Sequence, residues 1–345
     1  MSDYRRTIAV TGGAGFIGSN LLRRLVKAAS DCRFVCLDAL TYAGNPANLT
    51  DLENEPNYGF EQIDLCDHDG LKACFEKYRF DGVFNLAAES HVDRSISGPS
   101  PFLDTNIVGT FNLLELIRSA QEQGKQGRLL HVSTDEVYGS IESGQFDESS
   151  PYHPNSPYAA TKAAADHLVR SYVNTYGLDC VITNCSNNHG PYQHPEKFIP
   201  TVIRHAVAGE PIPVYGDGQN VRDWIHVFDH CMALDLVFEK GESGATYNVG
   251  SRCEQKNLDL AVTICRIVDD LLGDGKREEL IKLVDDRPGH DQRYAIDPSK
   301  IESTLSWAPQ TNFMIGLTQT IEWYLSHQDW IGNTLERTER MKGQS

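Results

Sequence analysis

A glycine-rich turn between an apolar strand and a helix constrains the fold of this chain more than any other feature. The apolar residues 7–10 lead into the turn, and a helical pattern follows over residues 19–29. The turn fits both Gly13-x-Gly15-x-x-Gly18 and Gly12-x-x-Gly15-x-x-Gly18. Glycines at these spacings let the backbone approach a pyrophosphate, whose charge is favoured by the N-terminus of the following helix. The turn therefore predicts a dinucleotide site.

An acidic residue refines this prediction. Asp38 ends the second predicted strand, residues 34–37, and lies 20 residues after Gly18. A carboxylate at this place accepts hydrogen bonds from a ribose 2′-hydroxyl and repels a 2′-phosphate, so NAD is favoured over NADP. Asp64 and Leu65 follow the third predicted strand and are candidates to flank the adenine.

Strands and helices alternate through the first half of the chain. Strands are predicted near residues 82–86, 128–132 and 179–183, with a helix near residues 105–123. A second helix has Ser156 as its N-cap, Pro157 at its first position and Gly177 past its end. Such alternation predicts an α/β protein with a Rossmann-type, doubly wound parallel sheet that helices cover on both faces.

The rhythm changes after about residue 187, where proline and glycine cluster. We expect residues 1–186 to form an NAD-binding domain, with a segment near 220–250 returning to its sheet. Residues 187–332 are expected to form mainly a smaller, mixed α/β substrate-binding lobe. The polar residues 333–345 are expected to be a flexible tail.

Composition excludes several classes of protein. The formal net charge of -17 argues against a nucleic-acid surface, which would favour a basic stripe. None of the nine cysteines forms a C-x-x-C pair, and no metal site is visible, so Cys32, Cys36, Cys180 and Cys185 are interpreted as buried small hydrophobes. The sequence has no signal peptide and no apolar run that could span a membrane, so we expect the protein in the cytoplasm.

Candidate catalytic acids and bases follow the strand predicted near residues 128–132. Thr134, Asp135 and Glu136 are consecutive, and Tyr158-x-x-x-Lys162 lies downstream. Tyr158 and Lys162 share one face of a helix, so the ammonium can lower the pKa of the phenol toward neutrality. Two adjacent carboxyls can supply an acid and a base if their surroundings separate their pKa values. This set suggests oxidation of a hydroxyl combined with an elimination.

The chain resembles the extended short-chain dehydrogenase/reductase superfamily and, more closely, the dTDP-glucose 4,6-dehydratase family. The resemblance spans roughly residues 7 to 300. Of the eight segments that carry it, the first and fifth belong to the whole superfamily, whereas Thr134-Asp135-Glu136 and the late Arg-Pro-Gly-His of residues 287–290 are much more specific. The eight segments are residues 11–19, 37–45 (LDALTYAGN), 87–93 (AAESHVD), 133–139 (STDEVYG), 158–162, 184–188 (NCSNN), 215–224 and 286–291 (DRPGHD).

The resemblance implies a mechanism that returns its cofactor. Tyr158, assisted by Lys162, removes the proton of the sugar 4-hydroxyl while C4 gives hydride to NAD⁺, and Thr134 binds the C4 oxygen. Glu136 then takes the C5 proton and Asp135 protonates the departing C6 hydroxyl, so water leaves. Hydride returns to C6, C5 is reprotonated, and the product is a 4-keto-6-deoxy sugar nucleotide.

The resemblance also assigns binding residues. Those expected at the cofactor are Gly12, Gly15, Phe16, Ile17, Gly18, Asp38, Thr41, Asp64, Leu65, Leu86, Ala88, Thr105, Tyr158 and Lys162. Those expected at the nucleotide-sugar substrate are Ser90, Thr134, Asn187 and Asn188 at the sugar, Lys197, Phe198, Pro213 and Tyr215 at the nucleotide, and Arg222, Asn257, Arg287 and His290 at the diphosphate and its ribose. The family usually forms homodimers, here through the helices near residues 105–123 and 158–176.

Three residues depart from the family pattern, and several alternatives stay open. His189 replaces a tyrosine, Phe228 an acidic residue and Thr161 a serine. His189 leaves the hexose and the base, dTDP or UDP, undecided if it contacts the sugar; the favoured alternative is that it only changes the packing behind the sugar-contacting residues. Related chemistry, a 4-epimerase or a sugar-acid decarboxylase, needs the tyrosine and lysine but no adjacent acid and base. A catalytically silent NAD-binding protein is a further alternative.

Overall fold

Seven parallel strands form the central sheet of this protein in a computed structural model that describes residues 4–273 and 275–342. Their order is β10-β6-β5-β4-β1-β2-β3. Most of these strands are apolar and buried on both faces, as expected of a parallel sheet between two layers of helices. They are β1 (Arg6–Thr11), β2 (Cys32–Asp38), β3 (Tyr58–Gln62), β4 (Gly82–Asn85), β5 (Arg128–Thr134), β6 (Cys180–Cys185) and β10 (Thr246–Val249).

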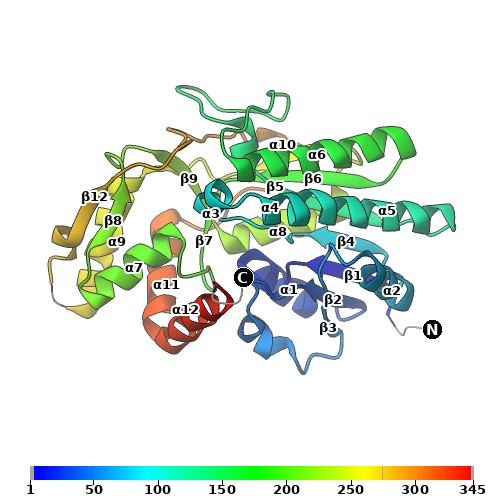
Figure 1. The fold of residues 1–345 in the computed structure, drawn as a ribbon, viewed down its shortest axis with the longest axis horizontal. Coiled ribbons are helices and arrows are strands. Elements are labelled where there is room, and N and C mark those ends of the chain that lie inside the picture. Colours follow the sequence, from blue (N-terminus) through cyan, green and yellow to red (C-terminus); the bar gives the residue numbers. More distant parts are fainter. Residues whose placement is uncertain (1–3, 274, 343–345) are drawn as a thin grey trace.

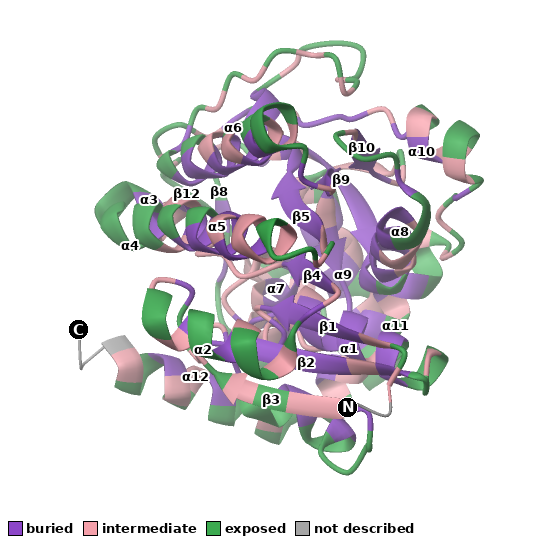
Figure 2. Cartoon of the chain, turned by 90° about the vertical axis from the view of Figure 1, so that its right-hand side faces the viewer, coloured by how far each residue is buried: buried purple, intermediate pink, exposed green. Residues whose placement is uncertain are grey.

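Helices cover both faces of this sheet, which confirms the predicted Rossmann-type fold (Figure 2). One apolar core joins the sheet to α1 (Phe16–Ala28), α8 (Val227–Lys240) and α10 (Ser299–Leu305). A second core joins the other face to α2 (His68–Tyr78), α5 (Gly109–Glu122) and α6 (Pro157–Tyr176). The short elements are η1 (Pro46–Leu52), α3 (Val92–Ser97), α4 (Ser100–Phe102), the π-helical η2 (Leu103–Val108), η3 (Asp135–Tyr138) and η4 (Arg277–Leu280).

The ends of α6 are those that the sequence predicts. The Ser156 side chain accepts a hydrogen bond from the Ala159 N–H, and Pro157 begins the helix. Gly177 ends it with φ +65°, a left-handed conformation that glycine adopts without steric cost. These caps fix which residues of α6 face the sheet.

The sheet has its topological switch point at β1. From this strand the chain proceeds to β2 on one side, whereas β4 pairs on the other. The loops after β1 and β4 therefore leave in different directions and open a crevice at the carboxyl ends of the strands. The glycine-rich turn follows β1 directly, so the fold places it at this crevice.

The second half of the chain builds a smaller lobe beside the sheet (Figure 1). Its core lies among four helices, including the C-terminal helix, and two short sheets, and the chain returns to the large sheet through β10. The elements are β7 (Asn187–His189), α7 (Phe198–Ala208), β8 (Ile212–Tyr215), β9 (Val221–His226), β11 (Glu254–Lys256), α9 (Asn257–Leu272), β12 (Ile281–Val284) and α11 (Phe313–Ser326).

The C-terminal segment differs from the prediction of a flexible tail. Residues Gln328–Lys342 form helix α12, and residues 343–345 lie outside the described part. Thr334 and Thr338 are 2% and 3% exposed, because their hydroxyls bond Asn45 and His194 of other segments. Ile331 of the same helix is buried in the core of the lobe, and Trp330 and Leu335 pack against that core. Beyond residue 335 the helix docks through hydrogen bonds, which the polar sequence conceals.

The described ranges contain no helix that is both long and apolar enough to cross a membrane. They contain no cluster of three or more side chains of the types that bind metal ions. The cysteines are free thiols, and Cys32, Cys36, Cys180 and Cys185 are buried, as predicted.

Candidate active site

One cavity opens at the carboxyl ends of the strands, and all predicted cofactor residues line it. The catalytic candidates line it too, together with five of the predicted substrate residues. Segments from the whole sheet and from the lobe thus meet at one place. The lining residues with a predicted role are Gly12, Gly15, Phe16, Ile17, Gly18, Asp38, Thr41, Asp64, Leu65, Leu86, Ala88, Ser90, Thr105, Thr134, Asp135, Glu136, Tyr158, Lys162, Asn187, Asn188, Lys197 and Phe198.

The glycine-rich turn has the geometry that a diphosphate requires. A Cβ at Gly12, where φ is +64°, would lie 2.8 Å from the Ala87 backbone, and one at Gly18 would lie 2.3 Å from the Gly12 oxygen. A Cβ at Gly15 would meet only that oxygen, at 3.2 Å. Gly15 is the N-cap of α1 and makes no side-chain cap, so the helix N-terminus faces the cavity without a competing side chain. These residues fit the dinucleotide predicted here.

Asp38 closes the turn and also faces the cavity. Its carboxylate accepts hydrogen bonds from the N–H groups of Ala14 at 2.9 Å and Leu40 at 2.8 Å. Burial raises the pKa of Asp38, and these two bonds oppose the rise. A carboxylate has about four acceptor positions, so two backbone bonds leave room for a ribose hydroxyl.

Thr134, Asp135 and Glu136 reach the cavity from the end of β5. Thr134 accepts a hydrogen bond from the Glu136 N–H at 3.3 Å, which caps the η3 turn. Its hydroxyl donates to Asp135 Oδ1 at 3.4 Å. The hydrogen bond from the Glu136 N–H begins the η3 turn, and the turn places both carboxyls at the cavity. The cap therefore shapes the local backbone and positions the reactive groups.

The two carboxyls experience different surroundings. Burial, and next the charge of Glu136, raise the pKa of Asp135 well above its usual range. Asp135 Oδ2 is buried without a hydrogen-bond partner in the described residues. Burial also raises the pKa of Glu136, but Arg287, Arg222 and Lys197 oppose the rise. This difference suits Asp135 as an acid and Glu136 as a base.

The prediction that Lys162 lowers the pKa of Tyr158 is wrong for this structure. Burial, followed by the charge of Glu136, raises the pKa of Tyr158 well above 10.0. The Lys162 ammonium instead donates to the Val132 carbonyl at 2.8 Å, and burial lowers its own pKa. Both side chains line the cavity from one face of α6, as the spacing predicts. Burial has a larger effect than the helical spacing, because removing the phenolate from water raises the pKa of Tyr158 more than a nearby cation lowers it.

The predicted substrate residues fall into two groups. Ser90, Asn187, Asn188, Lys197 and Phe198 line the cavity, and Lys197 Nζ donates to the Ser90 carbonyl at 2.9 Å. Pro213, Tyr215, Arg222, Asn257, Arg287 and His290 do not line it.

Tyr215 and Arg287 of the second group contact Asp93, a residue for which no role was predicted. Asp93 binds Arg287 at 2.9 Å and accepts a hydrogen bond from the Tyr215 hydroxyl at 3.1 Å. The rings of Tyr215 and His290 meet edge to face, 6.1 Å apart. Arg287 Nε is buried without a partner among the described residues, so the guanidinium retains a donor.

The remaining substrate candidates lie in the lobe, where Arg222 is buried, Asn257 half-buried and Pro213 exposed. Arg222 is 5% exposed and lies over the Tyr294 ring at 4.1 Å. Asn257 begins α9, and Pro213 pairs with Lys282 between β8 and β12. Their roles at a substrate stay predictions.

Several cavity residues were missed. Glu89 and Ser186 lie inside the segments 87–93 and 184–188, whose spacing could have indicated them. Gln193 and His194 carry no motif, and only the folded chain brings them to the cavity. The other missed residues include Tyr42, Ser133, Cys185 and Trp224.

The departures from the family pattern lie outside the cavity lining. His189 is 1% exposed and its Nδ1 lies 3.2 Å from the Thr320 hydroxyl of α11, so it packs the lobe. Thr161 donates to the Tyr158 carbonyl at 2.8 Å, which a serine hydroxyl would also do. Phe228 is 51% exposed beside His226 at the start of α8.

A glycine-rich turn at the switch point, facing a Tyr-x-x-x-Lys helix across one cavity, defines an extended short-chain dehydrogenase/reductase. A family model described as GDP-mannose 4,6 dehydratase matches residues 9–320. The chain is 49% identical to the dTDP-glucose 4,6-dehydratase of Escherichia coli, with 94% of each chain covered. It is 48% identical to that of Neisseria meningitidis, with 98% of each covered.

Solved structures agree with these relatives. The dTDP-glucose 4,6-dehydratase from Streptomyces venezuelae, solved with NAD bound, superposes with a TM-score of 0.89 at 45% identity. The match covers 95% of this chain and 99% of that one. The chain therefore belongs to the dTDP-glucose 4,6-dehydratase family, within the group that the 4,6 dehydratase model describes.

Proposed function

We propose that this protein is a hydro-lyase, a nucleotide-sugar 4,6-dehydratase that converts dTDP-glucose to the 4-keto-6-deoxy sugar nucleotide and water. The observation that carries the proposal is the pair of adjacent carboxyls in the cavity, Asp135 favouring its protonated form and Glu136 surrounded by cations. The base of the substrate is assigned from the names of the relatives, which are dTDP-glucose enzymes.

The cavity residues divide the binding of NAD among them. The N-terminus of α1, with Gly12, Gly15 and Gly18, is suited to the diphosphate, and Asp38 to the adenosine ribose. When bound, oxidised NAD would supply a hydride acceptor that is regenerated in each turnover, and its positive charge would favour the phenolate of Tyr158, which burial otherwise disfavours.

The side chains at the end of β5 and on α6 move the protons. The Tyr158 phenol oxygen takes the proton of the sugar 4-hydroxyl, and Lys162, fixed by Val132, holds its positive charge nearby. The Thr134 hydroxyl donates a hydrogen bond to the C4 oxygen. Once C4 is a ketone, the C5 proton is acidic and Glu136 removes it. Asp135 protonates the C6 hydroxyl, so the C6–O bond breaks and water leaves.

The substrate's nucleotide half is assigned to the lobe. Arg287 and Arg222 are proposed to bind the diphosphate, because a planar guanidinium donates two parallel hydrogen bonds to phosphate oxygens. Tyr215 and Pro213 are proposed to enclose the base. This division makes residues 1–186 the cofactor domain and 187–332 mainly the substrate lobe, with the segment near 220–250 shared between them.

We also propose a homodimer and a reducing compartment. Leu103, Val108 and Phe111 are 47%, 43% and 42% exposed along η2 and α5. Tyr176 of the neighbouring α6 is 47% exposed, so an apolar strip follows this helix pair. Pairing with a second copy would cover the strip. The free thiols fit the cytoplasm, where cysteines stay reduced.

The alternatives use fewer groups than the cavity provides. A 4-epimerase or a decarboxylase needs a tyrosine, a lysine and a hydroxyl, but no protonated carboxyl beside a base. A catalytically silent NAD-binding protein needs neither carboxyl, and burying Asp135 Oδ2 with no partner among the described residues is costly. The elimination is the reaction that uses both.

A turnover assay tests the proposal. The purified protein is incubated with dTDP-glucose and, separately, with UDP-glucose, without added reductant. We expect the mass of the sugar nucleotide to fall by one water, faster with dTDP-glucose, and the total NAD⁺ pool to stay constant. An isobaric product would identify an epimerase, and stoichiometric reduction of NAD⁺ a simple dehydrogenase. Tyr158→Phe should be slow, whereas Tyr176→Phe, on the exposed end of the same helix, should match the wild type.

A further inference from the structure

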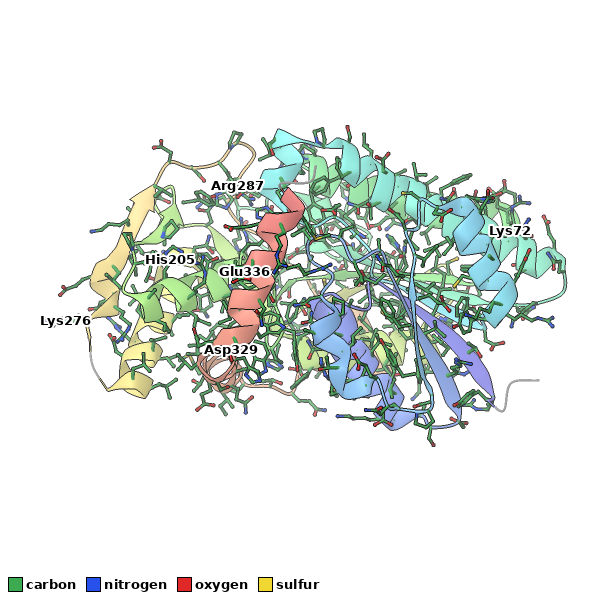
Figure 3. All side chains as sticks on the ribbon, turned by 60° about the horizontal axis from the view of Figure 1, so that its bottom comes forward. Lys72, His205, Lys276, Arg287, Asp329 and Glu336 are labelled. Atoms are coloured by element: carbon green, nitrogen blue, oxygen red, sulfur yellow. The ribbon has the colours of Figure 1, made fainter. Side chains whose placement is uncertain are left out.

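Helix α12 touches two loops that form walls of the cofactor cavity. Ala39, Thr41, Tyr42, Ala43 and Gly44 line the cavity on one side. Residues 193–198 contribute Gln193, His194, Lys197 and Phe198 from the lobe. The rings of Tyr42 and His194 meet edge to face at 5.6 Å, so the two loops are in direct contact. Figure 3 shows α12, marked by Asp329 and Glu336, lying between the lobe and the N-terminal elements.

Hydrogen bonds from α12 hold both loops. The Arg337 guanidinium donates to the Leu40 carbonyl at 2.7 Å and to the Gly44 carbonyl at 3.2 Å. Thr334 accepts a hydrogen bond from Asn45 Nδ2 at 3.0 Å. On the other loop, the Thr338 hydroxyl lies 3.0 Å from His194 Nε2. One face of a single helix therefore connects the two walls.

The contact with Leu40 is the most specific of these. Leu40 has φ +55°, a left-handed conformation that is unfavourable for a residue with a side chain. Its N–H donates to Asp38 Oδ1 and its carbonyl accepts from Arg337, so the strained residue is held from both sides. Asp38 is the residue proposed to bind the cofactor ribose. Arg337 thus holds the loop that sets the orientation of the Asp38 carboxylate.

A second link runs from α12 to the glycine-rich turn. Trp330 Nε1 donates to Asn48 Oδ1 at 2.9 Å, and Asn48 Nδ2 donates to the Ala14 carbonyl at 2.9 Å. Ala14 lies inside the turn and donates its N–H to Asp38. The helix is therefore connected to the proposed diphosphate and ribose positions through separate contacts.

We propose that α12 is a clasp on the cofactor cavity, in which Arg337 and Thr338 are positioning residues that slow the release of bound dinucleotide. This inference rests on the proposed NAD cofactor. A cofactor that is regenerated in each turnover need not leave, and a clasp at the C-terminal end of the chain keeps it in place. Neither residue lines the cavity, so each acts through the loop that it holds.

The test measures retention of NAD⁺ rather than turnover. Full-length protein is loaded with NAD⁺, separated from the free cofactor and diluted, and the bound fraction is followed with time. Arg337→Ala should release NAD⁺ about tenfold faster and Thr338→Val several-fold faster, the scale of lost hydrogen bonds. Arg340→Ala is the matched control, since Arg340 is exposed on the same helix and, among the described residues, bonds Glu336 of that helix. Added NAD⁺ at saturation should restore kcat in both test variants.

The outcomes separate this inference from the proposed function. Wild-type protein that binds NAD⁺, together with test variants that retain it equally long, overturns the clasp and leaves the function intact. A fall in kcat that saturating NAD⁺ does not restore also overturns it. Wild-type protein that neither carries nor binds NAD⁺ overturns the cofactor proposal itself. Should Arg337→Ala not fold, Thr338→Val carries the test, because it removes one hydroxyl and keeps the volume.

Discussion

The ammonium of Lys162 donates a hydrogen bond to the Val132 carbonyl at 2.8 Å, which ties α6 to β5 beneath the catalytic groups. Val132 lies two residues before Thr134 on the same strand. The bond therefore positions the buried cation relative to both the Tyr158 helix and the Thr134 strand. Because the Lys162 ammonium is held by the Val132 carbonyl, it acts on the Tyr158 phenol by electrostatic attraction and not by a direct hydrogen bond.

Lys162→Met should separate charge from packing. The methionine fills a similar volume but removes the cation, so we expect kcat at saturating NAD⁺ to fall about a hundredfold or more, the scale of a lost acid–base group. Steady-state kinetics with dTDP-glucose measure the effect. Lys240→Met, at an exposed position, is the control. A wild-type kcat in Lys162→Met would contradict the assigned role.

Glu136→Gln should uncouple elimination from oxidation. The amide cannot take the C5 proton, whereas Tyr158 is untouched, so reduced cofactor should accumulate after one encounter with substrate. Wild-type enzyme should exchange the C5 proton with solvent deuterium, and the variant should exchange it about a hundredfold more slowly. Glu142→Gln, at an exposed position, serves as the control. Full turnover by Glu136→Gln would remove this residue as the base.

Asp135→Asn should lower activity but stabilise the fold. Burial raises the pKa of Asp135 in the folded state above its value in the unfolded state. The protonated carboxyl therefore contributes its full stability below the unfolded-state pKa, and this stability is lost as pH rises through the folded-state pKa. Asparagine does not titrate, so its advantage in melting temperature should grow as pH rises through that window, by on the order of 1–2 °C per kcal/mol for a chain of this length. Melting curves across pH check this, and a difference that is independent of pH would contradict it.

Arg287→Ala should weaken binding of the nucleotide sugar. It removes a guanidinium that is held by Asp93 and retains a donor with no partner in the described part of the chain. We expect the KM for dTDP-glucose to rise about 10- to 100-fold, the scale of a charge-assisted pair. Arg287→Lys should recover part of the loss, because it keeps the charge but not the fork. Arg266→Ala, an exposed pair with Glu278, should have no effect.

Phe111→Glu should prevent self-association. Phe111 is exposed on α5 within the apolar strip, and a carboxylate there would be buried and unpaired in a dimer. Sedimentation should give a monomer for this variant and a dimer for the wild type. Leu283→Glu, which alters an exposed leucine of β12, should remain dimeric. A dimeric Phe111→Glu would place the interface elsewhere.

The sequence alone determined the features whose signals are local. Gly12, Gly15 and Gly18 predict the turn because no other residue allows so close an approach between α1 and its neighbours. The caps of α6 are equally local, since Ser156, Pro157 and Gly177 act within one turn of the helix ends. Apolar strands that alternate with helices leave few arrangements besides a covered parallel sheet.

Only the tertiary structure decided the features that depend on distant partners. Arg287 and Asp93 are 194 residues apart, and Arg337 and Leu40 are 297 apart, so no spacing in the sequence announces either contact. The pKa of Tyr158 followed burial rather than its spacing from Lys162, because desolvation is a property of the folded surroundings. The last part of helix α12 looked like a tail because polar side chains such as Arg337 and Thr338 make its docking contacts. Polar hydrogen bonds between distant segments have no periodicity, and the folded chain alone brings them together.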